Sequence, residues 1–393
     1  MTSLGEVGHE IAQMNESIVA LRRELHQIPE LAFEETRTSE LIACRMEELG
    51  LRVERGIGVT GVLGWLEGDR PGKTLMIRAD MDGLPMPEST GRPYASTIDN
   101  RNHACGHDMN MALALSTARV LSGRRERIAG KVAFVFQPAD EPQTGAQRMI
   151  DDGLLQKVHP DFVLAHHAMD NIPTGKVVAQ PGRIWASTNT MKLVIQGERA
   201  PSNTPHGGVD AALIAAEVVT SLYGMMHRVG PVRDEVVFRV NTITTQAGPE
   251  GPRAEVGMRL ATYTKASQET LRPRIESIVS GIVTALGSTY TLEDTLVLPP
   301  VHNDPAVAQT VINAASQVLG PENIIQDWRN LFSDDIALFL DATPGCVFCM
   351  GTFNPDKGTG GFHRPDYDID EDALVPGVEI MTLAALELLN SAS

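Results

Sequence analysis

The sequence predicts an α/β fold with a second, α+β domain inserted into it. Apolar strands alternate with helical segments in the first half of the chain, and polar residues follow the strand ends, as in doubly wound sheets. Beyond residue 188 the pattern changes to β-α-β-β-α-β, and the alternation of strands and helices resumes at about residue 302. We therefore expect residues 1–188 and 302–393 to form one discontinuous domain and residues 189–301 to form the insertion.

The elements before the insertion follow from the spacing of apolar residues. Apolar residues recur at helical spacing from Ile18 to Leu49 with a break near Pro29, which predicts two opening helices. Lys131–Phe136 is a continuous apolar run, as expected for a strand buried on both faces of a parallel sheet. The other predicted elements are strands at Gly61–Glu67, Thr74–Ala79 and Phe162–Ala165 and a helix from about Asn110 to Leu121.

The inserted segment has its own regular order of elements. Its predicted strands are Thr190–Gln196, Glu235–Thr244, Ala254–Tyr263 and Tyr290–Leu298, and its predicted helices are Gly208–Val229 and Ser267–Leu286. After it we expect a helix, a strand at Cys346–Met350 and a closing helix at Leu374–Leu389.

Composition excludes several classes of partner. The 393 residues carry 33 Lys and Arg against 50 Asp and Glu, a net charge of −17, which disfavours nucleic acid as a partner. No stretch approaches the roughly 18 apolar residues of a membrane span, so we expect no membrane partner. Four scattered cysteines and no secretory leader favour a reduced, cytoplasmic protein. Nucleotide-binding and serine-hydrolase motifs are absent from the sequence.

Cys105 and His107 form the first cluster of possible metal ligands. They flank Gly106, whose backbone freedom allows a turn that directs both side chains inward. Thiolate and imidazole together suit zinc, manganese, cobalt or a related divalent ion. For this motif alone, a buried thiol beside a surface histidine is the simpler interpretation.

Two further pairs follow predicted strands. Asp140 and Glu141 end one strand, and their side chains point different ways, so one can bind metal while the other reaches the attacking water. His166 and His167 end another strand, and either of them is a candidate ligand. Each pair alone also fits an ordinary loop end or a structural histidine.

His363 lies far along the chain, after a Gly-rich loop, and completes the set. One thiolate, three imidazoles and a carboxylate at the strand ends of one core are enough to hold two divalent ions and leave positions for water. The concurrence of these donors, rather than any single motif, predicts a metal-dependent hydrolase.

Several ordered motifs resemble a known family over nearly the full length of the chain. They are LRRELHQIPELAFEETRT, IRADMDGLPMPE, NHACGHD, FQPADE followed by GAQRMIDDG, IPTGKV, TPHGGVD, SDDIALF and GFHRPDYDIDEDAL. They resemble the aminoacylase and carboxypeptidase metallopeptidases, a family that includes hippurate hydrolases and indole-acetyl-amino-acid amidohydrolases. The resemblance implies a zinc-peptidase-like catalytic domain with an inserted lid that commonly forms the dimer, so we expect a homodimer or higher homo-oligomer.

The resemblance assigns roles to individual residues. Asp140 takes the place of the family's general base, and Asp82 that of a carboxylate that orients a metal ligand. His167 rather than His166 matches the family's ligand, because it keeps the family's distance to the following Pro-Thr-Gly. The implied metal ligands are Cys105, His107, Glu141, His167 and His363, for one or two ions per subunit, with manganese or zinc expected.

The chain also departs from the family's pattern. The family's base is a glutamate, one methylene longer than Asp140. Pro201 stands where a lid histidine helps polarise the scissile amide. Candidates for a substitute polar contact to the substrate are Arg199, Asn203, His206 and Asn110.

The resemblance implies a hydrolase that cleaves a carbon–nitrogen bond of a small carboxylate-bearing substrate with metal-activated water. One alternative is hydrolytic deamination of an aminobenzoate, as performed by the related 5-nitroanthranilate aminohydrolase. Another is a relative that binds metal and a small ligand without turnover.

Overall fold

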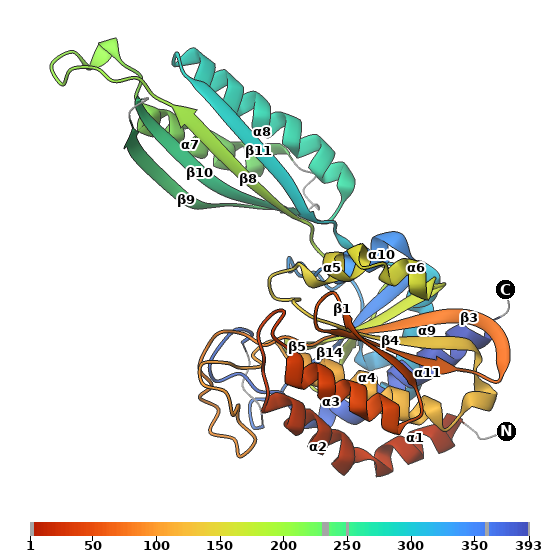
Figure 1. Ribbon diagram of the computed structural model, residues 1–393. Coiled ribbons are helices and arrows are strands. Elements are labelled where there is room, and N and C mark those ends of the chain that lie inside the picture. The colour runs from red at the N-terminus through yellow and green to blue at the C-terminus, as the bar shows by residue number, and fades with distance from the viewer. Residues whose placement is uncertain (1–3, 230–235, 249–250, 358–360, 392–393) are drawn as a thin grey trace. The chain divides into compact units, whose positions relative to one another are not determined.

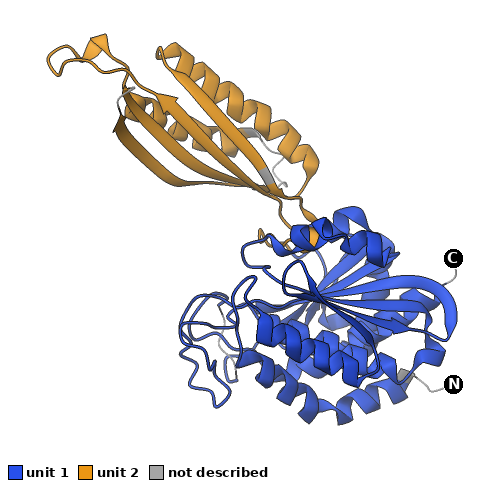
Figure 2. Cartoon of the chain, viewed as in Figure 1, with its two compact units in different colours: residues 1–184, 302–328, 338–393 blue, residues 185–301, 329–337 orange. Residues whose placement is uncertain are grey.

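The computed structural model describes residues 4–229, 236–248, 251–357 and 361–391. These divide into two compact units, shown in Figure 2. Unit 1 comprises residues 1–184, 302–328 and 338–393, and unit 2 comprises residues 185–301 and 329–337. The segment 329–337 thus belongs to unit 2 although it follows the inserted stretch in sequence.

Unit 1 is built on an eight-stranded sheet with the order β1-β2-β4-β3-β5-β14-β6-β13 (Figure 1). Its strands are β1 Arg52–Ile57, β2 Gly61–Glu67, β3 Arg70–Asp80, β4 Ala129–Gln137, β5 Phe162–Pro173, β6 Val177–Val178, β13 Ile324–Ile325 and β14 Gly345–Phe353. The central strands β4, β3, β5 and β14 are parallel, whereas β1 and β2 run antiparallel at one edge. The predicted α/β class is confirmed, with a mixed rather than purely parallel sheet.

Helices cover this sheet and close its core. They are α1 Leu4–Gln13, α2 Asn15–His26, α3 Thr36–Glu48, α4 His107–Ser122, α5 Gly145–Asp151, α6 Leu154–Val158, α9 Pro305–Leu319 and α11 Leu374–Asn390. Helices α4 and α11 pack against β3, and α9 packs against β14. Almost every side chain of α4 is buried, because this helix lies in the middle of the core.

The hydrophobic pattern located most elements but not all. In unit 1 its misses include α1, the short helices α5 and α6, and the strands β1, β6 and β13. It also placed the start of β3 four residues late, because the first residues of that strand are exposed and lack the run of buried apolar side chains that marks the rest. Among the described residues, no helix is long and apolar enough to cross a membrane.

Unit 2 contains an antiparallel sheet with the order β11-β8-β10-β9 and two long helices. Its main elements are β8 Thr188–Gln196, α7 Ala211–Val229, β9 Val236–Gly248, β10 Gly251–Thr262, α8 Lys265–Ala285 and β11 Thr289–Leu298. The chain order is the predicted β-α-β-β-α-β. A separate core of apolar side chains joins α7 and α8 to one face of the sheet. The described residues also form β7 Gly182–Trp185, β12 Val301–Asn303, α10 Ile336–Ala342 and four short 3-10 helices.

Candidate metal centre

The carboxyl ends of three neighbouring strands supply the polar residues of the centre. Strand β3 lies between β4 and β5 and runs parallel to both, so the three ends meet at one edge of the sheet. Asp80 ends β3 and Asp82 follows it, Asp140 and Glu141 follow β4, and His167 lies in β5. Residues far apart in sequence are thereby brought together.

A left-handed turn brings two more donors to this edge. Gly106 precedes α4 with φ of 83°, and a Cβ built there would lie 2.8 Å from the Cβ of Ala168 and 2.9 Å from the hydroxyl of Tyr367. Glycine is therefore required for the chain to pass between these residues. Cys105 and His107 on either side of it both face the site, as the motif predicts.

The five predicted donor residues gather in two overlapping groups. Within each group the possible ligand atoms lie no more than 4.8 Å apart; the groups are Cys105, His107 and His167, and Cys105, Glu141 and His363. The Sγ of Cys105 lies 4.0 Å from Nε2 of His167, and Oε2 of Glu141 lies 3.5 Å from Nε2 of His363. Because Cys105 belongs to both groups, the arrangement suits two neighbouring ions with a shared ligand.

The structure shows which of His166 and His167 faces the donor set, a choice that the strand pattern did not decide. His167 points to the centre, with its ring edge-on to that of His107 at 5.8 Å between centroids. Its Nδ1 lies 2.6 Å from the carbonyl oxygen of Ala168, which leaves Nε2 toward Cys105. His166 is buried against Phe348 instead, and neither of its ring nitrogens has a hydrogen-bond partner among the described residues.

His363 reaches the centre from a strained backbone position. Its φ is 60°, in the left-handed region, and its backbone N–H donates to the carbonyl of Ala104 at 2.9 Å. This bond ties the C-terminal loop to the segment that carries Cys105. About half of the His363 side chain is exposed, so it lies on the open side of the cluster.

Asp82 connects the strand ends to one another. Its two carboxylate oxygens accept the backbone N–H groups of Asp140 and Glu141 at 3.0 and 3.1 Å. Its backbone oxygen lies 2.8 Å from Nδ1 of His107, and its Oδ1 lies 3.4 Å from the same nitrogen. Asp82 thus fixes the orientation of the His107 ring so that Nε2 faces the other donors.

Two buried atoms of the donor set lack hydrogen-bond partners among the described residues. They are Nε2 of His107 and Oε1 of Glu141, which lie 3.9 Å apart. Leaving such atoms unsatisfied is costly, and a divalent cation between them would satisfy both. With sulfur, nitrogen and oxygen donors converging, the residues fit a divalent ion such as zinc or manganese.

The electrostatics of the cluster reflect its burial and its crowding with acids. Burial, aided by the charges of Asp140 and Asp82 and opposed by His107, raises the pKa of Glu141 to about 7. Burial together with the charge of Glu141 raises the pKa of the Cys105 thiol well above its ordinary value. A bound cation reverses both tendencies, because it favours thiolate and carboxylate.

Comparison with known proteins identifies the family. Residues 76–387 match the peptidase family M20/M25/M40. The chain belongs to this family. It is therefore a metal-dependent hydrolase of the M20 type, in agreement with the donor set.

Similar M20 proteins cover almost the whole chain. Thermostable carboxypeptidase 1 of Saccharolobus solfataricus is 30% identical over 99% of this chain and 100% of that protein. The N-acetylcysteine deacetylase of Bacillus subtilis is 30% identical over 95% of this chain and 97% of that protein. The solved structure of the Bacillus subtilis YXEP protein, a dinuclear metal-binding M20 peptidase, is 27% identical, with a TM-score of 0.84 over 97% and 99% of the two chains.

Asn110 of this M20 chain makes its contacts within the protein. Its Nδ2 donates to Oδ1 of Asp80 at 2.7 Å, and its Oδ1 accepts the backbone N–H of Ala168 at 3.2 Å. The side chain is buried and links the ends of β3 and β5. The predicted substrate contact therefore finds no support in this geometry.

The other predicted substrate contacts lie in unit 2, on the loop between β8 and α7. Arg199 donates from its guanidinium to the carbonyl of Gly248 at 2.9 Å, at the end of β9. Pro201, Asn203 and His206 are exposed on the same loop. His206 belongs to none of the possible metal-ligand groups among the described residues.

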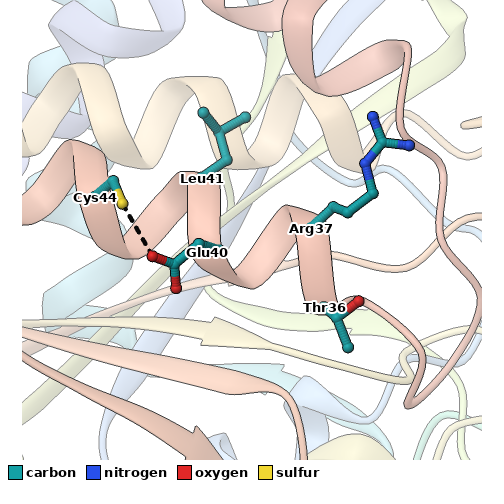
Figure 3. Close-up of a pocket in the computed structure, with 5 residues that line it drawn as sticks. All are labelled: Thr36, Arg37, Glu40, Leu41 and Cys44. Carbon is teal, nitrogen blue, oxygen red and sulfur yellow. Dashed lines mark hydrogen bonds between the residues drawn. The ribbon is translucent and has the colours of Figure 1, made fainter.

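A separate pocket of about 450 Å³ lies on α3 (Figure 3). Its lining residues are Thr36, Arg37, Glu40, Leu41 and Cys44. The Cys44 thiol donates to Oε1 of Glu40 at 3.2 Å, and this contact raises the pKa of the thiol. The contact favours the protonated thiol, which is the less nucleophilic form.

Sequence reasoning missed two residues of the centre. Arg78 lies in β3 and forms ion pairs with Asp80 and Asp140, although it is only 2% exposed. A charged residue inside the apolar run Leu75–Ala79 needs buried partners of opposite charge, so its presence there could have indicated Arg78 from the sequence. The second residue is Asp80, which accepts from both Arg78 and Asn110.

Proposed function

We propose that this M20 chain is an amidohydrolase that cleaves the amide bond of a small N-acylated amino acid. The observation that carries the proposal is the convergence of five metal-donor residues and the additional carboxylate of Asp140 at one sheet edge. The similar carboxypeptidase and N-acetylcysteine deacetylase act, by their names, on amides next to an amino acid carboxylate. The substrate class follows from this shared chemistry.

The donor set defines where the metal binds. The residues that would hold it are Cys105, His107, Glu141, His167 and His363. A divalent ion at this place supplies a Lewis acid that polarises the amide carbonyl and lowers the pKa of water.

Asp140 is the side chain placed to move the proton. Its Oδ1 is bound by Arg78, and its Oδ2 lies 3.7 Å from Nε2 of His107, on the side of the donor set. We assign to Oδ2 the acceptance of a proton from the attacking water and its return to the amide nitrogen as the C–N bond breaks.

Activity on a defined panel tests this proposal. The purified protein, loaded with Mn²⁺, Zn²⁺ or Co²⁺, is incubated with N-acetyl amino acids, and the released amine is measured. We expect hydrolysis by the wild type, a loss of about 100-fold or more in kcat for Asp140→Asn with metal retained, and loss of metal for Glu141→Ala. Absence of hydrolysis across the panel with every metal would overturn the proposal.

A second candidate is hydrolytic removal of the amino group of an aminobenzoate. It is favoured by Pro201, which has no side-chain donor where the family resemblance expects a histidine. An electron-poor ring accommodates developing charge itself and needs this donor less. Release of ammonia from 5-nitroanthranilate, without activity on N-acetyl amino acids, would select this reaction. No turnover of either class, with metal bound, would indicate a binding protein.

A further inference from the structure

Arg78 occupies an unusual place for a charged residue. Its side chain is 1% exposed, within the buried half of β3, where an unpaired charge would be strongly disfavoured. All three of its guanidinium nitrogens bind side chains. Nε donates to Oε1 of Gln137 at 2.9 Å, NH1 donates to Oδ2 of Asp80 at 2.6 Å, and NH2 donates to Oδ1 of Asp140.

The two carboxylate oxygens of Asp140 have different surroundings. Oδ1 is bound to Arg78, on the side of the sheet core, whereas Oδ2 lies 3.7 Å from Nε2 of His107. The backbone N–H of Asp140 donates to Asp82, and the preceding Ala139 has φ of 53°. The backbone of Asp140 is thus held by Asp82 and by the N–H of Gln143, which its carbonyl accepts at 2.7 Å, while Arg78 binds its carboxylate.

Arg78 is itself held against rotation. Asp80 accepts from Arg78 with one oxygen and from Asn110 with the other, and Asn110 also binds the backbone of Ala168 in β5. A line of hydrogen bonds thus runs from β5 through Asn110, Asp80 and Arg78 to Asp140. The planar guanidinium bridges two carboxylates in a fixed geometry, which a lysine ammonium would not reproduce.

We propose that Arg78 is the positioning residue for Asp140: it anchors Oδ1 so that Oδ2 is presented to the donor set. An aspartate has only two side-chain torsions, and anchoring one oxygen by a rigid partner fixes both of them. The catalytic consequence rests on the proposed hydrolase function, whereas the placement of Asp140 does not. Nothing in the arrangement requires Arg78 to touch substrate.

Crystal structures test the placement directly. Wild type and Arg78→Met are compared in the same metal-loaded form, with Arg78→Lys as the second variant if Arg78→Met does not fold. We expect the Asp140 carboxylate to turn and Oδ2 to move by about 1 Å or more, while Asp82 and His107 stay in place. An Asp140 carboxylate unmoved in these variants would overturn the proposal.

Kinetics tests whether Arg78 acts through Asp140. In hydrolysis of an N-acetyl amino acid, Arg78→Met should lower kcat by about 100-fold with a small change in KM and unchanged bound metal. In an Asp140→Asn background the same substitution should cause little further loss, because residues acting as one unit are not additive. Guanidinium ion should partly restore the activity of Arg78→Ala.

The controls separate the alternatives. Arg124→Lys alters another largely buried arginine, paired with Glu10, and should leave kcat unchanged. Two outcomes would refute positioning of Asp140 by Arg78. One is that the kcat losses of Arg78→Met and Asp140→Asn multiply in the double variant, and the other is that Arg78→Met loses its bound metal. If the wild type hydrolyses no N-acetyl amino acid, the proposed function fails, and the crystallographic comparison alone still decides the role of Arg78.

Discussion

At the scale of single residues, two adjacent histidines show how one position in a strand separates a ligand from a core residue. His166 and His167 alternate across β5, so only one of them faces the donor set. Burial, with His167 as its neighbour, lowers the pKa of His166 well below its usual value, so this ring is neutral. His166 therefore behaves as a packing residue with two unsatisfied nitrogens among the described contacts.

Matched substitutions of this pair should give opposite results. His167→Leu should weaken zinc binding by more than the roughly 10–100-fold that loss of an outer-shell partner costs. His166→Leu should keep metal binding and change the free energy of unfolding by less than about 1 kcal/mol, because it removes unsatisfied polar atoms. Zinc titration by calorimetry and urea unfolding measure both effects; equal metal affinity in the two variants would contradict the assignment.

The cysteines allow a second comparison at this scale. Cys105→Ser removes the donor common to both ligand groups, whereas Cys44→Ser changes a thiol on α3 that belongs to neither group. We expect Cys105→Ser to retain less than half of the wild-type metal after dialysis and Cys44→Ser to retain all of it. Elemental analysis of the dialysed proteins gives the answer.

At the scale of elements, α4 is placed by the turn in front of it. Gly106→Ala would force a side chain into the left-handed region and against Ala168 and Tyr367, at a cost of about 2 kcal/mol or more. Gly123, at the other end of α4, has φ of −78° and no atom closer than 3.8 Å to a built Cβ. Gly123→Ala should therefore be neutral or stabilise by about 0.5 kcal/mol. Chemical unfolding compares the two, and a harmless Gly106→Ala would show that the turn is not required.

At the scale of the molecule, a buried network joins four distant parts of unit 1. His26 at the end of α2 contacts Asp108 in α4 at 2.7 Å and Glu88 in the loop between β3 and α4 at 3.3 Å. Arg22 binds Asp108 at 2.6 Å and Asp368 near the C-terminus at 2.8 Å. The groups that face His26 are Arg22, Glu88, Tyr94, His103 and Asp108.

This network predicts how stability depends on pH. Burial and Arg22 lower the pKa of His26, but Asp108 and Glu88 outweigh them, so its pKa is raised above the ordinary value. The protonated ring therefore stabilises the fold fully below about pH 6.5, and this contribution is lost as pH rises through the raised pKa. The difference in unfolding free energy between wild type and His26→Gln should shrink from pH 6 to pH 9. A constant difference over this range would show that the charge of His26 is unimportant.

The local sequence alone was enough to predict the fold class and to identify the donor residues. Hydrophobic periodicity is a local property, so most strands and helices of both units could be predicted from the chain, including the β-α-β-β-α-β order of unit 2. Polar residues placed after strands indicated a site because parallel strand ends meet at one edge.

Tertiary structure decided which of these residues meet and how they are held. The engagement of Asn110 with Asp80 depends on a contact between α4 and β3, and the binding of Asp140 by Arg78 depends on a contact between β3 and the segment after β4. These two contacts join residues 30 and 62 positions apart, and no periodicity within one segment encodes which atoms of distant elements will touch. The amino-acid sequence therefore determined which donor and acceptor side chains are available, and tertiary packing determined which of them bind one another.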